Sequence, residues 1–314
     1  MTIPVTRRSP LLDLPGSVEA EGVDAGVAAH YGSLHGEQRS LASGQGFVDL
    51  SHRDVLAVTG PDRLTWLHSL TTQHLEALPP HTWTWALVLS PQGHVEHAFA
   101  GFDDGERFVA HTEPGAGEAL RGFLDRMRFM LRVEVLDLSD ELACVWTPTG
   151  YEMVERSALP TYADAHGPAC GTWAFEALRI ARGEPRFGVD TDARTIPNEV
   201  GWIPSAVHLD KGCYRGQETV ARVHTLGRPP RRLTLLHLDG SEEHLPAHGA
   251  EVTHEGRAVG VVGSAARHHE LGPIALALLK RNVPVDAPLV ADGVAATQEV
   301  VVDPDIGLHV RARL

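Results

Sequence analysis

The spacing of apolar residues changes several times along the first two thirds of the chain. Short apolar or alternating runs, which are typical of strands, are separated by stretches where apolar residues recur every three or four positions, as on one helix face. The pattern predicts strands within 46–60, 82–102, 107–112, 132–139 and 141–148, with 82–102 forming a hairpin. It predicts helices over 60–78, over 117–132 and at the start of 172–190.

Details within the two longer helical stretches support these predictions. Pro61 and Asp62 suit the first turn of the helix over 60–78, because proline fits that position and a carboxylate is stabilised at the positive end. One face of the helix over 117–132 is apolar and comprises Leu120, Phe123, Leu124, Met127 and Met130.

Hairpins rather than regular strand–helix–strand units dominate this pattern, which favours α+β lobes over a doubly wound nucleotide-binding sheet. Neither the G-x-G-x-x-G nor the P-loop sequence occurs. After the Gly-Pro-Pro sequence within 225–232, short strands separated by glycine turns predict a small β-barrel. We therefore expect an irregular N-terminal arm (1–45), an α+β region (46–228) and a C-terminal β-barrel (229–314).

Composition and charge exclude several classes of partner. The chain is 43% hydrophobic and 22% charged, as in ordinary globular proteins. Its net charge of 27 − 41 = −14 disfavours a broad nucleic-acid interface. No apolar run approaches the roughly 18 residues that span a bilayer, and the first residues lack the apolar stretch of a secretory signal. We expect a cytoplasmic protein that binds neither nucleic acid nor membrane.

The cysteines and histidines do not form a metal-binding pattern. Cys144, Cys170 and Cys213 show no C-x-x-C spacing, so neither a disulfide framework nor a zinc ribbon is indicated. Two of the three are expected to be small buried residues. The 19 histidines are scattered without an H-E-x-x-H sequence, and we expect no metal site.

The octapeptide KGCYRGQE, residues 211–218, gathers the most chemically capable side chains. Lys211 lies two positions before Cys213 and can activate a thiol by lowering its pKa. The alternative is that Cys213 is only a small residue in a crowded turn. Gly212 and Gly216 permit backbone conformations or close approaches that a Cβ would block.

The end of the octapeptide and the residues after it suit a planar ligand. Gln217 and Glu218 can hydrogen-bond to a heterocycle, and Arg222 can bind a ligand carboxylate. Equally, Lys211 can pair with Asp210, and Glu218 with Arg222 four positions later on a helix. The residues alone leave both interpretations open.

The octapeptide resembles the K-G-C-x-x-G-Q-E signature of the YgfZ-type folate-binding proteins. These are relatives of the glycine-cleavage T-protein (GcvT, the aminomethyltransferase) and include a mitochondrial branch in iron–sulfur assembly. Other segments similar to the family are 58–75, 178–199, 221–233 and 260–281, so the resemblance runs from about residue 46 to the end.

The resemblance implies a three-lobed ring of two α+β, ferredoxin-like lobes and a β-barrel, with tetrahydrofolate bound near the centre. It implies a role in assembling or maintaining iron–sulfur clusters, with iron–sulfur proteins or cluster-assembly proteins as partners. Cys213 would be a reactive thiol with Lys211 as its activator. The implied folate-binding residues are Arg179, Glu199, Lys211, Tyr214, Gln217, Glu218 and Arg222.

Two departures from the T-protein pattern count against aminomethyl transfer. The pterin-binding glutamate of T-proteins corresponds to Ala181, and their folate-orienting aspartate corresponds to His97, with Glu96 beside it. Aminomethyl or other one-carbon transfer is therefore the alternative function, and whether the chain is an enzyme stays open. A cluster-binding scaffold built on Cys213 is disfavoured because stable clusters usually take four thiolates.

Overall fold

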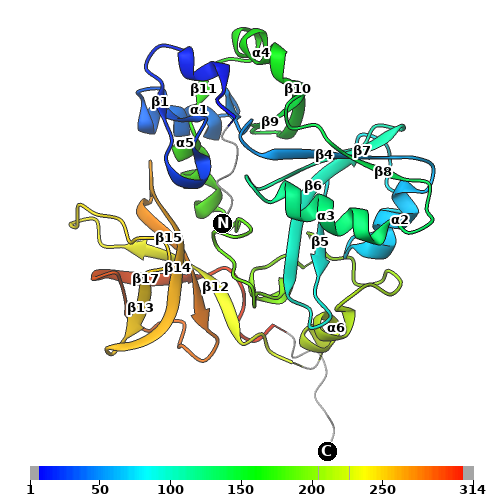
Figure 1. Ribbon diagram of the computed structural model, residues 1–314. Helices are drawn as coiled ribbons and strands as arrows, with labels where there is room; N and C mark the ends of the chain where they lie inside the picture. Colours follow the sequence, from blue (N-terminus) through cyan, green and yellow to red (C-terminus); the bar gives the residue numbers. More distant parts are fainter. Residues whose placement is uncertain (1–6, 204, 226, 307–314) are drawn as a thin grey trace, which may run out of the picture. The chain divides into compact units, whose positions relative to one another are not determined.

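The computed structural model describes residues 7–203, 205–225 and 227–306 (Figure 1). Within them, two compact units form: one holds residues 7–68, 75–85 and 99–178, and the other holds the remainder. The division passes through two strands, β5 (Thr84–Leu89) and β6 (Val95–Asp103). The sequence-based boundaries after residues 45 and 228 divide the chain into three consecutive parts rather than into these two units, and they stay a prediction.

Short helices and strands account for most of the described chain. The α-helices are α1 (Leu34–Ala42), α2 (Arg63–Leu70), α3 (Gly117–Met127), α4 (Leu159–Ala165), α5 (Thr172–Ala181) and α6 (Gln217–Thr225). The remaining strands of the first two thirds are β1 (Val18–Glu19), β2 (Ala28–His30), β3 (Phe47–Asp49), β4 (Asp54–Thr59), β7 (Arg107–Thr112), β8 (Glu134–Asp137), β9 (Leu142–Thr147), β10 (Gly150–Glu155) and β11 (Ala169–Cys170). Among the described residues, no helix is long and apolar enough to cross a membrane.

Two larger sheets carry the α+β part of the chain. One has the strand order β5-β6-β7-β4-β8, and α3 packs on its strands β4 and β8. The other has the order β10-β9-β3-β11, in which β3 and β11 are parallel while β3–β9 and β9–β10 are antiparallel. Antiparallel pairing with an interspersed set of helices confirms the predicted α+β class.

The C-terminal strands close into a barrel with the order β12-β15-β14-β13-β16-β17, drawn from yellow to red in Figure 1. They are β12 (Arg231–Leu238), β13 (Glu251–His254), β14 (Arg257–His268), β15 (Gly272–Lys280), β16 (Leu289–Ala291) and β17 (Val294–Val300). Closure leaves no free sheet edge and encloses an apolar core that includes Leu236, Val252 and Leu279. The predicted small β-barrel is confirmed.

Two predicted helices are shorter than their apolar periodicity indicated. The helix over 60–78 ends at Leu70, because Thr72 donates its backbone N–H to the Leu87 carbonyl oxygen instead of continuing the helix. The helix over 117–132 ends at Met127, since Phe129 has a φ of 47°, which lies outside the helical region. Met130 is consequently 89% exposed rather than part of the buried face.

The N-terminal segment contains short elements and contributes to the core of the first unit. It holds two 3-10 turns, Pro10–Asp13 and Gly22–Asp24, besides β1, β2 and α1. Leu11 is 1% exposed and packs in an apolar cluster with side chains of β3, β9 and α4.

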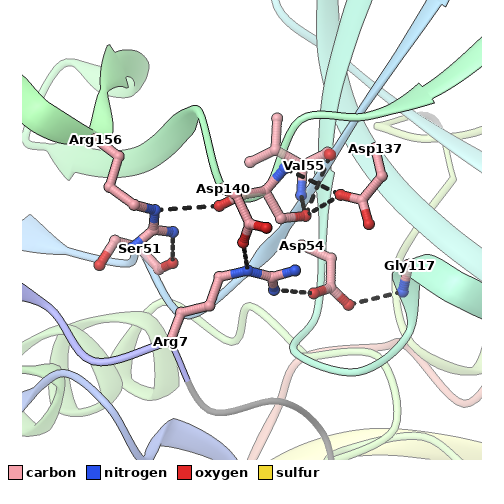
Figure 2. Close-up of polar contacts among 9 residues, drawn as sticks. Arg7, Ser51, Asp54, Val55, Gly117, Asp137, Asp140 and Arg156 are labelled. Carbon is pink, nitrogen blue, oxygen red and sulfur yellow. Dashed lines mark hydrogen bonds and ion pairs between the residues drawn. The ribbon is translucent and has the colours of Figure 1, made fainter.

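A polar network joins this segment to the strands beneath it (Figure 2). Arg7 donates to Asp140 (2.6 Å) and to Asp54 (3.1 Å), and the other oxygen of Asp54 accepts the Gly117 N–H at the start of α3 (2.8 Å). Nearby, Arg156 donates to the Ser51 carbonyl oxygen (2.5 Å). One arginine therefore connects the chain start to both β4 and the turn after β8.

Candidate functional site

The octapeptide 211–218 lies in the second unit, against the turn that joins β5 to β6. Gly216 has a φ of 79°, and a Cβ there would stand 2.5 Å from the Ser90 carbonyl oxygen and 2.9 Å from the Gly93 Cα. The predicted need for glycine is confirmed at this position. It is wrong at Gly212, where the backbone does not require glycine and a Cβ would meet no atom within 4 Å.

Lys211 is the buried cation of this loop and is 5% exposed. Its Nζ donates to the carbonyl oxygens of Thr71 (2.5 Å) and Gln73 (3.2 Å), and it lies 5.3 Å from the centre of the Tyr214 ring. Burial lowers the pKa of Lys211 to about 8 and raises the pKa of Tyr214 to about 12. The amine is therefore a weak base held by neutral acceptors.

The three cysteines separate into one accessible thiol and two buried ones. Cys213 is exposed, whereas Cys144 and Cys170 are buried in one apolar cluster of the first unit. Burial raises the pKa of each of these two thiols to about 12, so both stay protonated at neutral pH. The prediction that two of the three are small buried residues is confirmed.

The residues after Cys213 begin α6. Gln217 is its first residue, and its N–H donates to the Tyr214 carbonyl oxygen (3.2 Å). Glu218 and Arg222 form the i,i+4 ion pair at 3.0 Å, with side chains 88% and 64% exposed. A pair so exposed contributes little to stability and can rearrange around a ligand. The ion-pair interpretation is confirmed here, and the folate-binding roles stay predictions.

Arg179 and Glu199, the other two predicted folate-binding residues, are engaged by their own chain. Arg179, 2% exposed, binds Asp190 at 2.8 Å. Glu199, fully buried, accepts hydrogen bonds from Nε and Nη2 of Arg231 at 2.9 Å each. The first pair connects α5 to the segment after it, and the second connects that segment to β12.

No sequence signal marks the acceptors of Lys211, because backbone carbonyl groups are present at every residue. A second missed contact is the ion pair between Arg215 and Glu96 on β6, at 2.9 Å. The pair places Arg215, a residue of the octapeptide, beside β6. This pair occupies Glu96, the carboxylate next to His97.

A polar and aromatic cluster in the first unit was also missed. His111 is 1% exposed, its ring lies 4.5 Å from that of Tyr151, and the rings of Trp83 and Trp85 lie 5.9 and 6.0 Å away. Burial, and then the charge of Arg53, lower the pKa of His111. The spacing Trp83-x-Trp85 on one strand face was the available signal.

The Nδ1 atom of His111 lies 3.3 Å from the Arg53 guanidinium, which can only donate. The proton of the neutral ring therefore sits on Nε2, a buried atom without a hydrogen-bond acceptor in the described chain.

Comparisons with known proteins extend over most of the chain. Residues 231–302 match the family model of the CAF17 C-terminal beta-barrel domain. An aminomethyltransferase from Bacillus subtilis is 22% identical, with 87% of this chain and 91% of that protein covered. An aminomethyltransferase from Rippkaea orientalis is 25% identical, with 88% and 90% covered.

The crystal structure of the glycine cleavage system aminomethyltransferase T from Bartonella henselae is similar, with a TM-score of 0.77 and 17% identity. The match covers 95% of this chain and 96% of that one. At this identity the likeness establishes the fold. The chain thus has the aminomethyltransferase T fold, with mixed α/β sheets and a closed C-terminal barrel of the CAF17 type.

Proposed function

We propose that this protein is a tetrahydrofolate-binding accessory factor for the assembly or repair of iron–sulfur clusters. The observation that carries the proposal is that a single loop holds one accessible thiol, Cys213, and a buried amine of lowered pKa, Lys211. The other two thiols are buried, so the chain is poorly suited to hold a cluster by itself. One exposed thiol suits transient chemistry with iron–sulfur or cluster-assembly proteins as partners.

Folate as the ligand is supported by the likeness to aminomethyltransferases along nearly the whole chain and by the chemistry of the loop. A pterin is flat and hydrogen-bonds along one edge, which suits Gln217 and Glu218. Its glutamate tail is anionic, which suits Arg222 and Lys211. Tyr214 supplies an aromatic side chain beside Lys211.

Aminomethyl transfer is the second candidate function, and the names of the relatives favour it. By the resemblance to T-proteins, Ala181, the last residue of α5, stands where they carry a glutamate, and His97 stands where they carry an aspartate. Glu96 is poorly placed to take the role of that aspartate, because it is paired with Arg215 and because neighbouring strand residues point to opposite faces of the sheet. Formation of methylene-tetrahydrofolate from a methylamine donor would establish this candidate instead.

The test combines anaerobic calorimetry with complementation of a deletion strain. We expect Cys213→Ala to abolish recovery of iron–sulfur enzyme activity while leaving tetrahydrofolate affinity nearly unchanged. Lys211→Ala should weaken that affinity about tenfold, which corresponds to about 1.4 kcal/mol.

Cys170→Ala is the matched control, since it removes a buried thiol from another part of the chain. Full complementation by Cys213→Ala would remove the thiol from the mechanism. Absence of measurable tetrahydrofolate binding by the wild-type protein would refute the folate role.

A further inference from the structure

The turn that follows α3 (Figure 1) carries exposed apolar side chains. Phe129 is 91% exposed and Met130 is 89% exposed, while Leu131 is 44% exposed. Single exposed apolar residues are common on protein surfaces, but three in succession form a contiguous patch. We call residues 126–132, which comprise the end of α3 and the turn after it, the α3 loop.

The backbone holds this loop in shape at both ends. Trp66 Nε1 donates to the Met127 carbonyl oxygen (3.2 Å) where α3 ends. Asp62 receives the Arg132 backbone N–H (2.9 Å) and two of its guanidinium nitrogens (3.1 and 2.7 Å). Between these anchors, the φ of 47° at Phe129 is a conformation that bulky residues rarely adopt. The exposed apolar side chains are therefore presented by a turn that is anchored at both ends.

Basic side chains flank the apolar tip. Residues 121–132 contain four arginines and one aspartate, a net charge of +3 in a chain of net charge −14. Arg126 and Arg128 are exposed, and neither guanidinium has a hydrogen bond or ion pair within the part of the chain that the structure describes. A shallow hollow of about 560 Å³ lies beside the tip, lined by Thr59, Gly60 and residues 128–134.

We propose that the α3 loop is a docking surface for a partner protein that offers an acidic patch around an apolar pocket. Phenylalanine, methionine and arginine are enriched at the centres of protein interfaces, and a preorganised loop lowers the entropy cost of binding. The unpaired arginines would meet carboxylates, while Phe129 enters the pocket and a partner side chain fills the hollow.

Two other occupants fit the loop less well. A symmetric contact with a second copy would bring Arg126 and Arg128 against their own counterparts, which repel. An anionic membrane would attract the loop but repel the remaining surface, whose charge is strongly negative. The proposal uses only residues of the first unit and does not depend on folate binding.

To test this, a photo-crosslinking amino acid replaces Met130 in the full chain in cells, and the segment to which it crosslinks is sequenced. We expect a segment of another protein that is net acidic and contains apolar residues. The crosslink yield should fall at least tenfold with Arg126→Glu and Arg128→Glu combined. A synthetic peptide of that segment should bind the purified wild-type protein by calorimetry, and the double variant at least tenfold more weakly.

Phe129→Ser should weaken binding of the same peptide at least fivefold. Arg257, an exposed arginine on β14, supplies the charge-matched control, and Arg257→Glu should leave the peptide affinity unchanged. Circular dichroism of each variant establishes that it is folded. The proposal is overturned if no crosslink forms, if the crosslink is to this chain or to lipid, or if the crosslinked segment is basic or uncharged. It is also overturned if charge reversal at Arg126 and Arg128 leaves the crosslink yield unchanged.

Discussion

Lys211 and Lys280 are the two lysines of the chain, so the protonation of the buried amine can be observed directly. Reductive methylation with 13C-formaldehyde gives resolved NMR signals for both side chains and the α-amino group. The Lys211 signal should titrate near pH 8, because burial disfavours the charged amine. Lys211→Arg should remove that signal alone, and titration of the Lys211 signal near pH 10.5 would contradict the assignment.

The same shift has a defined effect on stability. The folded-state pKa of about 8 lies below the unfolded value near 10.5, so between these limits the unfolded chain binds more protons. The cost of burying the charged amine is therefore complete below pH 8 and is relieved as the pH rises towards 10.5. With a pKa of about 8, most Lys211 side chains carry a proton at neutral pH, and the charged form is the one that can stabilise a thiolate or an anionic group of a ligand.

At the scale of elements, the contact between the octapeptide and the β5–β6 turn gives a matched pair of variants. Gly216→Ala should destabilise the protein by about 2–3 kcal/mol, since it combines a positive φ with a Cβ placed against backbone atoms. Gly212→Ala should change stability by no more than about 0.5 kcal/mol, because its Cβ meets open space. Urea unfolding of the two variants measures the difference, and equal stability would show that the loop does not rest on the turn.

The elements themselves were largely predictable, because alternation in 82–102 and the glycine-separated strands after 229 are local signals. The ends of α2 and α3 were not, since they depend on a backbone bond to Leu87 and on the turn at Phe129. For the site, the residue types of the octapeptide were informative, whereas the acceptors of Lys211 lie 138 to 140 positions away. Contacts at such separations leave no periodicity in a single sequence.

Charged residues of the candidate site show the same limit. Arg179 and Glu199 have suitable chemistry for a ligand, and in the structure they form ion pairs with Asp190 and Arg231. A charged residue in a motif has the same letter whether or not it has such a partner, so the sequence alone does not reveal these pairs. The folate-binding roles of Arg179 and Glu199 stay predictions.

At the scale of the whole molecule, charge is distributed unevenly around the fold. The net charge of −14 belongs to a chain whose α3 loop carries +3. A protein of negative net charge repels partners of the same sign, and a local basic patch then favours acidic ones. The candidate ligand loop and the α3 loop belong to different compact units, so binding at each can be tested independently.

The last prediction concerns the N-terminal segment, which the sequence predicts to be an irregular arm but which contributes to the core of the first unit. Leu11 is buried with Phe47, Val145 and Leu159, which come from distant parts of the chain. Leu11→Ala should lower the free energy of unfolding by about 2–5 kcal/mol, through lost apolar contact and a residual cavity. Val23→Ala, at a position 50% exposed in the same segment, should cost no more than about 0.5 kcal/mol. Chemical denaturation followed by tryptophan fluorescence measures both. Since an arm lying loosely on the surface would make the two substitutions equally mild, a large effect of Leu11→Ala alone identifies the segment as part of the core that the first unit needs in order to fold.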